Sequence, residues 1–192
     1  MTKLPNFKIT VSTSEILKQL RDEKPDERTK RMIASLINKS KALINPKAIV
    51  KEFKITRKGK DSVEIRKKLK IKSSNVAFLL KDCETVTFFA CTLSSDFQEK
   101  SENLLVSIVV DAIGSVAVEK LAERVNKVIF EKAKKKGFKI TQRYSCGFAD
   151  WSLDDQPKIL KMLDASKIGL KVNKANILIP RKSITAIIGW HK

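Results

Sequence analysis

The segment Leu104-Leu-Val-Ser-Ile-Val-Val-Asp-Ala-Ile-Gly-Ser-Val-Ala-Val-Glu119 has a hydrophobic periodicity that continues to Lys135. Apolar pairs recur every four residues, and Leu121 and Val125 fill the one gap between them. This spacing predicts a single helix about 48 Å long, at about 1.5 Å per residue. We expect Gly137 to end it, because glycine readily adopts the left-handed conformation that closes many helices.

Around this helix, shorter helices and strands are mixed irregularly. Ser12 and Glu15 form a capping-box pair that predicts a helix to about Asp22, and a second helix is expected from Pro25 to Ile44. Further short helices are expected after Ser73 or Ser74 and at 154–163. Strands are expected at 6–11, 48–56, 62–65, 85–93, 138–143, 168–172, 175–179 and 183–188. Because the closing strands are joined by short links, we predict an α+β fold with a curved, largely antiparallel sheet.

The length of 192 residues predicts a single domain, 1–192, within which residues 1–72 form a basic N-terminal segment of helices and strands. The apolar run 104–118 is interrupted by Asp111 and is too short to span a bilayer. The N-terminal residues lack an apolar segment behind a basic start. We therefore expect no membrane association and a cytoplasmic location.

The number and spacing of the cysteines and the histidine disfavour catalysis or metal binding by these residues. Cys83, Cys91 and Cys146 lack CxxC spacing, and His191 is the sole histidine. A zinc site needs about four clustered nitrogen or sulfur ligands, which this set does not easily supply. Ser-His and Cys-His catalysis are also disfavoured. We expect free thiols, no metal and no catalytic residue.

The net charge of +19 leaves several interpretations open. Residues 51–72 hold ten Lys or Arg against three acids, and Lys132 to Lys139 adds a second cluster. Such a surface could bind nucleic acid through its phosphates. Lysine dominates, however, and aromatic residues available for stacking on bases are not interleaved with these cations. A solvated Lys-rich surface is favoured, with steering of an acidic protein partner as an intermediate possibility.

The segment Arg143-Tyr-Ser-Cys-Gly-Phe-Ala-Asp-Trp151 is the clearest candidate for ligand binding. It follows a β-prone run and brings a cation, a lone glycine and aromatic residues into one loop. An arginine at a strand end can hold a carboxylate through two parallel N–H···O bonds. Gly147 allows close backbone approach or a positive φ. A surface arginine and an ordinary turn glycine are the alternatives.

A polar stripe accompanies the apolar face of the long helix. Asp111, Ser115 and Glu119 recur at every fourth residue and so share one side of the helix. An acid there could accept a hydrogen bond from a ligand's ammonium group or balance another positive charge. The alternative is simply the solvated side of the helix.

Three segments in this order resemble the S-adenosylmethionine-binding activation domain of cobalamin-dependent methionine synthase. They are the helix around Val110–Glu119, the loop 143–151, and Ile-Leu-Ile-Pro180-Arg-Lys-Ser183-Ile-Thr-Ala-Ile-Ile-Gly189. The resemblance is greatest to short stand-alone relatives, whose loop reads approximately Arg-x-Ser-Pro-Gly-Tyr-Gly-Asp-Trp. It extends from about Ser12 to Gly189 and is dense only from Leu104 onward, so it makes 73–192 the activation-domain-like core.

The resemblance implies a twisted antiparallel sheet with helices against it and assigns roles to several residues. Arg143 would bind the carboxylate of S-adenosylmethionine, and Asp111 or Glu119 its ammonium or sulfonium group. The loop along the ligand would comprise Tyr144, Ser145, Cys146, Gly147, Phe148 and Ala149. Asp150 and Trp151 would anchor this loop.

The loop departs from the family pattern at three positions. Cys146 replaces a proline, Phe148 a tyrosine, and Ala149 a proline or glycine. Loss of proline leaves the loop less pre-organised, and loss of tyrosine removes a hydroxyl. Affinity for S-adenosylmethionine is the property that these changes bring most into question.

The function implied is that of an accessory subunit, inactive alone, in a methyltransferase reaction of the methionine synthase type. It would support reductive remethylation of cob(II)alamin carried by a separate corrinoid-dependent methyltransferase or corrinoid protein. A flavodoxin or another reductant would supply the electron. The alternatives are a binding or assembly protein of the same fold that has lost the ligand, and a basic nucleic-acid-binding protein.

Overall fold

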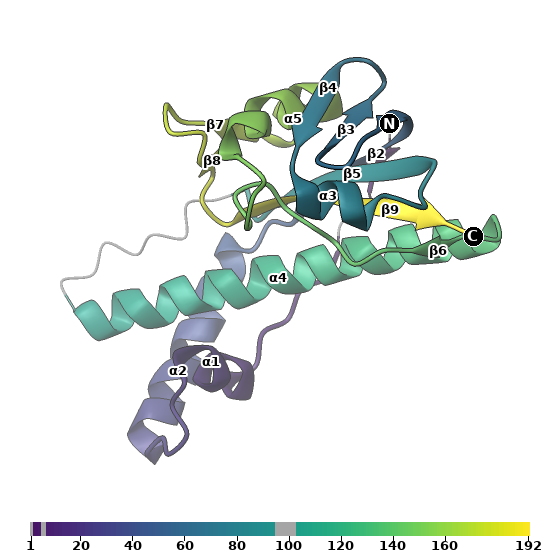
Figure 1. Ribbon diagram of the computed structural model, residues 1–192. Helices are drawn as coiled ribbons and strands as arrows, with labels where there is room; N and C mark the ends of the chain where they lie inside the picture. Colours follow the sequence, from purple (N-terminus) through teal and green to yellow (C-terminus); the bar gives the residue numbers. More distant parts are fainter. Residues whose placement is uncertain (1, 5–6, 95–102) are drawn as a thin grey trace.

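The computed structural model describes residues 2–4, 7–94 and 103–192 (Figure 1). Its strands are β1 Thr2–Lys3, β2 Lys47–Lys58, β3 Ser62–Ile65, β4 Leu69–Lys72, β5 Thr85–Thr92, β6 Lys139–Ile140, β7 Lys171–Val172, β8 Leu178–Ile179 and β9 Ser183–His191. Its α-helices are α1 Thr13–Leu20, α2 Glu27–Ser40, α3 Ser74–Leu79, α4 Leu104–Lys135 and α5 Gln156–Leu163. Short 3₁₀ turns are η1 Lys41–Leu43, η2 Leu153–Asp155 and η3 Ala165–Ile168.

One antiparallel sheet organises the molecule. Its strands follow the order β4-β3-β2-β5-β9-β6, with β1 added to β2, while β7 and β8 form a separate hairpin. The pairing of β2 with β5 joins the basic N-terminal segment to the rest of the chain in a single sheet. The predicted α+β class with a largely antiparallel sheet is therefore confirmed.

The two faces of the sheet carry two separate apolar cores. Side chains alternate along a strand, so Phe89 packs into one core and its neighbour Phe88 into the other. Helices α4, α1 and α2 cover the first face, with α1 and α2 lying beyond α4, whereas α3 and α5 cover the second (Figure 1). The predicted helix 104–135 is confirmed, and Gly137 follows it with φ +76°.

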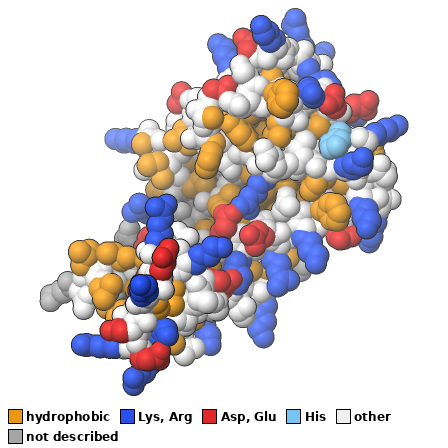
Figure 2. Space-filling view, turned by 60° about the horizontal axis from the view of Figure 1, so that its bottom comes forward, with side chains coloured by type: hydrophobic (Ala, Val, Ile, Leu, Met, Phe, Trp, Pro, Cys, Tyr) orange, Lys and Arg blue, Asp and Glu red, His pale blue; other side chains and the backbone are white. Residues whose placement is uncertain are grey.

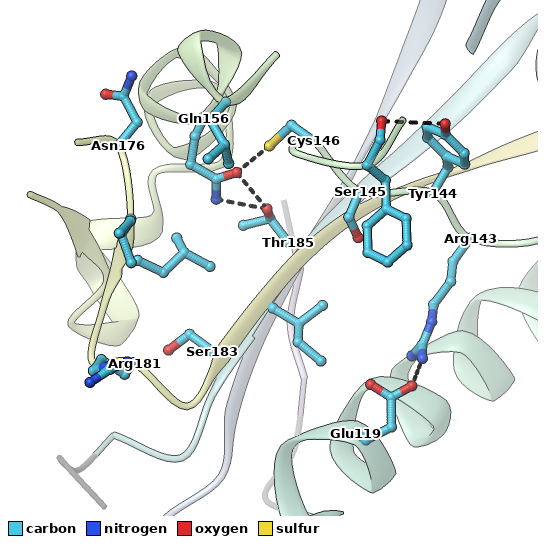
Figure 3. A pocket seen from close by; sticks show the side chains of 15 residues that line it. Glu119, Arg143, Tyr144, Ser145, Cys146, Gln156, Asn176, Arg181, Ser183 and Thr185 are labelled. Atoms are coloured by element: carbon cyan, nitrogen blue, oxygen red, sulfur yellow. Dashed lines mark hydrogen bonds and ion pairs between the residues drawn. The ribbon is translucent and has the colours of Figure 1, made fainter. Parts of the chain in front are cut away.

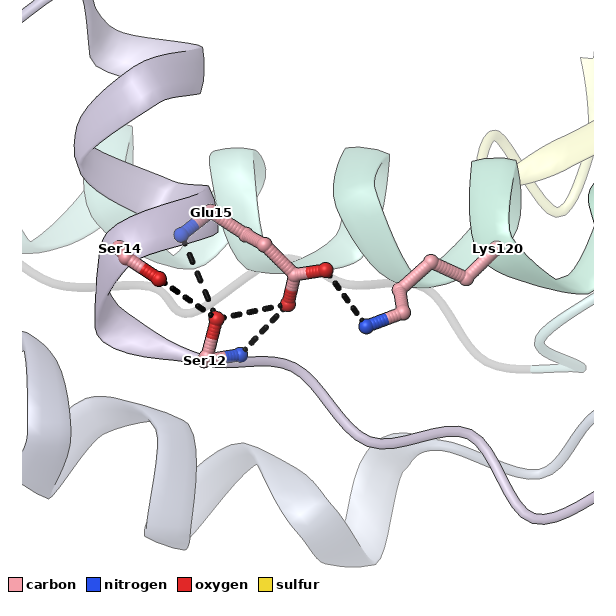
Figure 4. A network of polar contacts seen from close by, with 4 residues as sticks. All are labelled: Ser12, Ser14, Glu15 and Lys120. Carbon is pink, nitrogen blue, oxygen red and sulfur yellow. Dashed lines mark hydrogen bonds and ion pairs between the residues drawn. The ribbon is translucent and has the colours of Figure 1, made fainter.

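Both N-terminal helices have side-chain caps, and that of α1 is the one the sequence predicts. Ser12 and Glu15 form the capping box of α1, and Glu15 Oε1 accepts a bond of 2.6 Å from Lys120 Nζ on α4 (Figure 4). This contact with Lys120 lowers the pKa of the Glu15 carboxyl. Asp26 caps α2 through a 2.6 Å bond from the Thr29 amide. The capping box therefore also fastens α1 to the long helix.

The strand expected at 6–11 is wrong over its described residues, 7–11, which form no regular element; Asn6 lies outside the described residues. Phe7, Ile9 and Val11 nevertheless pack against the core. Their alternation reflects burial against helices and not a position in the sheet. Strand β4 was not predicted, and the strand expected at 138–143 is reduced to β6. Within the described ranges, none of the helices is long and apolar enough to cross a membrane.

Candidate functional site

A pocket of about 580 Å³ lies where α4, the loop after β6, the start of α5, the β7–β8 hairpin and β9 meet. Figure 3 shows Arg143 and Glu119 at one side, Gln156 and Thr185 at another, and Arg181 at the far rim. Its lining is Glu119, Arg143, Tyr144, Ser145, Cys146, Phe148, Leu153, Gln156, Asn176, Ile177, Leu178, Arg181, Ser183, Ile184 and Thr185. We call it the loop pocket.

Arg143 is held by an ion pair but keeps unused donors. Its Nη2 contacts Glu119 Oε1 on α4, and its side chain is 27% exposed. Its Nη1 is buried and has no hydrogen-bond partner among the described residues. Because a buried donor left unsatisfied destabilises the protein, this nitrogen favours an incoming acceptor. Arg143 therefore lines the loop pocket with one guanidinium nitrogen paired and another buried without a partner in the described part of the chain.

The loop carrying Arg143 is fixed to the sheet by its backbone. Tyr144 and Ile187 exchange hydrogen bonds of 3.0 and 2.8 Å. The Gly147 amide donates a hydrogen bond of 2.7 Å to Trp151 O, so it is already paired within the loop. Gly147 has φ +84°, and a Cβ there would lie 2.9 Å from Leu153 Cδ2. The backbone conformation therefore favours glycine, and a Cβ would also require the exposed Leu153 side chain to shift.

Asp150 joins the loop to helix α3. Its carboxylate accepts bonds from Ser73 Oγ at 2.5 Å, from the Ser74 amide at 2.6 Å and from Asn75 Nδ2 at 2.9 Å. These bonds, led by those from Ser73 and Asn75, lower the pKa of Asp150 to about 2. The carboxylate thus acts as a cap for α3 supplied by a distant segment.

Trp151 anchors the loop in the apolar core that α3 and α5 cover. Its side chain is 1% exposed, and its Nε1 donates to Asp155 Oδ2 at 3.0 Å. Its ring stacks on Tyr144, with centroids 6.2 Å apart and planes at 10°. Together with Asp150, it gives the loop two attachments directly after the segment that lines the pocket.

A buried polar cluster forms one wall of the loop pocket (Figure 3). Gln156 Nε2 donates to Thr185 Oγ1 at 2.7 Å, and the Cys146 thiol bonds to Gln156 Oε1. Burial raises the pKa of the Cys146 thiol to about 11. The thiol is therefore protonated at neutral pH and serves as a donor, not as a nucleophile.

Among the described residues, no group of three or more His, Cys, Asp or Glu side chains could hold a metal ion.

Six of the predicted ligand-binding residues line the loop pocket: Glu119, Arg143, Tyr144, Ser145, Cys146 and Phe148. Gly147 and Ala149 belong to the loop but are not part of the lining, and Ala149 has φ +47°. Asp111 is also outside the lining. Its carboxylate accepts a 2.7 Å bond from Lys182, which bonds to Ser115 Oγ at 2.8 Å.

Sequence reasoning missed the contribution of the closing segments. Gln156 and Thr185 are both almost fully buried, although they are polar. A threonine in the apolar run of β9 was a signal, because buried hydroxyls require a partner. The identity of that partner, 29 residues away, could not be read from local spacing. Arg181 and Asn176, at the rim, gave no signal.

No family model matches the chain, and no curated protein matches it by sequence. Among solved structures, it is similar to a crystal structure of the MetH reactivation domain bound to AdoHcy, with a TM-score of 0.64. The match covers 98% of this chain and 79% of that chain at 14% sequence identity. The likeness therefore establishes a reactivation-domain fold, in agreement with the predicted fold class.

Proposed function

We propose that the loop pocket binds S-adenosylmethionine and that the protein is an accessory activation subunit for a separate corrinoid-dependent methyltransferase. The observation that carries the proposal is the Arg143 guanidinium, placed beside Glu119 at the pocket with its Nη1 unpartnered. The fold adds support, since the similar MetH reactivation domain was solved bound to AdoHcy.

The Arg143–Glu119 pair matches the amino-acid end of this ligand. A carboxylate can accept two parallel bonds from a guanidinium, and a carboxylate side chain can accept a bond from an ammonium group. A zwitterionic ligand would thus satisfy both partners of the pair at once and leave no net charge at that end. The pocket volume of about 580 Å³ lies within the usual range for small-molecule sites, about 300–1,000 Å³.

The remaining lining suits the adenosine moiety. Phe148, Leu153 and Ile177 are exposed apolar residues at the pocket, available to cover a purine ring. The Gln156 amide, next to Thr185 and Cys146, can present its second Nε2–H to a ring nitrogen. Phe148 takes the place of the family's tyrosine and keeps an aromatic surface there.

The proposed role requires binding and orientation, not acid–base chemistry. When bound, S-adenosylmethionine supplies the methyl group for a reduced corrinoid on the partner protein. Arg143 and Glu119 would fix one end of the ligand while the 144–149 loop leaves its methyl group facing outward. The net charge of +19 would favour encounter with an acidic corrinoid protein or an acidic reductant such as a flavodoxin.

Isothermal titration tests the proposal. The native protein should bind S-adenosylmethionine, and Arg143→Ala should weaken binding by about 100-fold, since a hydrogen-bonded charge pair is lost. Arg28→Ala, at an exposed site on α2, is the matched control and should bind normally. Decarboxylated S-adenosylmethionine should bind the native protein and Arg143→Ala equally. Absence of binding by the native protein would refute the proposal.

One observation favours a second candidate, a binding or assembly protein that has lost the ligand. Glu119 already neutralises Arg143, so the pair is stable without a ligand. Under this alternative, neither the native protein nor Glu119→Gln, which frees the guanidinium, would bind S-adenosylmethionine. Binding by either protein excludes it.

A further inference from the structure

A second hollow, separate from the loop pocket, lies between β2, the β3–β4 turn and α5. Its volume is about 580 Å³, and Figure 1 shows α5 beside the β3–β4 hairpin. It is lined by Lys51, Phe53, Arg66, Lys68, Lys158, Lys161 and Met162. We call it the lysine pocket. Five cations from three elements, far apart in the sequence, therefore converge on one concavity.

Three of these cations lack an acidic partner. Lys51 Nζ bonds to Met162 O at 3.0 Å and lies 3.5 Å from Asp164 Oδ2. Lys158 Nζ lies 3.2 Å from Asp155 Oδ1. Within the described residues, however, Arg66, Lys68 and Lys161 form no ion pair. The lining itself contains no acid, so the pocket carries an uncompensated positive charge.

A second basic hollow of the molecule contains an acid as well as cations. A hollow along α4 is lined by Arg124, Lys127, Lys132 and Lys135, but also by Glu131, and its Lys132 pairs with Glu52. Figure 2 shows Asp and Glu side chains scattered among the Lys and Arg side chains of the visible face. The lysine pocket differs from the hollow along α4 in that no acid lines it.

The aromatic residue of the pocket is already covered. Phe53 is 3% exposed, with the Phe88 ring at 5.1 Å. Lys51 Nζ and Arg66 Cζ lie 5.7 and 5.8 Å from the centre of the Phe53 ring. Stacking of a nucleobase on this ring is therefore prevented. A ligand here would be recognised through its negative charge.

The β3–β4 turn holds cations in an unfavourable backbone conformation. The Lys68 amide bonds to Ile65 O at 3.0 Å, and the two central residues, Arg66 and Lys67, have φ of +51° and +55°. Glycine or asparagine is preferred at such positions. The strained turn directs the chain so that Arg66 and Lys68 line the same pocket as Lys161 of α5.

We propose that the lysine pocket binds a compact polyphosphate anion, free or as the polyphosphate group of a nucleotide. Several lysine ammonium groups act as point charges around the anion, and the arginine adds directed N–H donors. Concentrated anionic charge matches three unpaired cations in a small concavity better than a single carboxylate does. This site is independent of the proposed S-adenosylmethionine site.

Titration with inorganic triphosphate tests this inference. The double variant Lys68→Ala/Lys161→Ala should bind triphosphate at least about tenfold more weakly, because charge-assisted bonds are lost. Lys24→Ala/Lys174→Ala removes the same charge at exposed positions outside the pocket and should bind within about twofold of the native protein. Equal weakening of both variants would show that binding follows net charge alone, and no binding by the native protein would likewise overturn the inference.

Two further arms identify the ligand class. Triphosphate and ATP should bind with similar affinity, since the covered Phe53 ring cannot hold a base; binding of ATP without triphosphate would overturn the inference. So would binding of single-stranded DNA without triphosphate. S-adenosylmethionine binding by Lys68→Ala/Lys161→Ala should match that of the native protein, and circular dichroism melting checks that the variant is folded. Failure at one pocket is thereby distinguished from failure at the other.

Discussion

The loop pocket and the lysine pocket have similar volumes but are constructed differently. In the loop pocket, Arg143 is matched by Glu119, and Gln156, Thr185 and Cys146 satisfy one another in the interior. In the lysine pocket, cations from separate elements surround an already covered ring. Directional hydrogen-bonding groups select a ligand by shape and bonding, whereas unpaired surface charges select mainly by charge.

The two pockets should also differ in their contribution to stability. The loop pocket is attached to the core through the buried residues Trp151, Gln156 and Thr185, so changing these residues should destabilise the fold. Lys68 and Lys161 of the lysine pocket are exposed and should contribute little to the fold, so changing them should alter binding alone.

The largest expected effect is that of Trp151→Ala. The buried indole contacts Tyr144 and Asp155, so its loss should reduce the free energy of unfolding by about 3–5 kcal/mol. Lys161→Ala should change it by no more than about 0.5 kcal/mol. Urea unfolding compares the two. A reduction below about 1 kcal/mol for Trp151→Ala would contradict the view that the loop pocket is built into the core.

A matched pair of glycines separates backbone strain from crowding. Gly147→Ala combines a φ of +84° with a contact at 2.9 Å to Leu153, whereas Gly137 has φ +76° and open space around it. Each change should cost about 1 kcal/mol in backbone strain, and Gly147→Ala about 1 kcal/mol more. Because Leu153 lines the loop pocket, Gly147→Ala alone should weaken S-adenosylmethionine binding. If Gly147→Ala and Gly137→Ala lowered the melting temperature equally and left the same S-adenosylmethionine affinity, the contact with Leu153 would be relieved by movement of that side chain.

The Asp150 cap predicts a specific acid sensitivity. Its pKa of about 2 in the folded protein lies below the unfolded value of about 3.9. The stabilisation is therefore complete above about pH 4 and is lost as the pH falls toward about 2. Asp150→Asn should be less stable than the native protein at neutral pH, and the difference should shrink over this window. A difference independent of pH in urea unfolding would contradict this role of the carboxylate.

The smallest expected effect is a gain in stability. Arg66→Gly and Lys67→Gly each relieve a positive φ and should raise the free energy of unfolding by about 0.5–1 kcal/mol. Arg66→Gly should also weaken triphosphate binding, because Arg66 lines the lysine pocket and Lys67 does not. Equal triphosphate affinity in the two variants would place Arg66 outside the site.

Much of the local structure could be predicted. The α4 pattern, the Ser12 cap and the apolar strand β5 all depend on neighbouring residues, and the structure confirms them. Asp150 and Trp151 do anchor the loop, as expected. The prediction of a strand over 7–11 was wrong because alternation of apolar residues indicates which side chains are buried, and it does not show that the backbone pairs with another strand.

The candidate site could be predicted only incompletely. The spacing of Asp111 and Glu119 made them equivalent, yet Glu119 pairs with Arg143 at the pocket and Asp111 with Lys182 away from it. Arg143 lies in an ion pair and still borders a cavity, a combination that no spacing rule distinguishes from a fully enclosed salt bridge. The lysine pocket gave no signal beyond general basicity.

The sequence by itself determined the long helix, the capping box of α1 and the buried central strands, because periodicity and capping act between residues close in the chain. The two loop anchors were expected from the family resemblance. The tertiary structure alone decided which acid faces Arg143, which amide meets Thr185 and which cations converge beside α5. Those partners lie many residues apart, and their meeting depends on how the two faces of the sheet are covered.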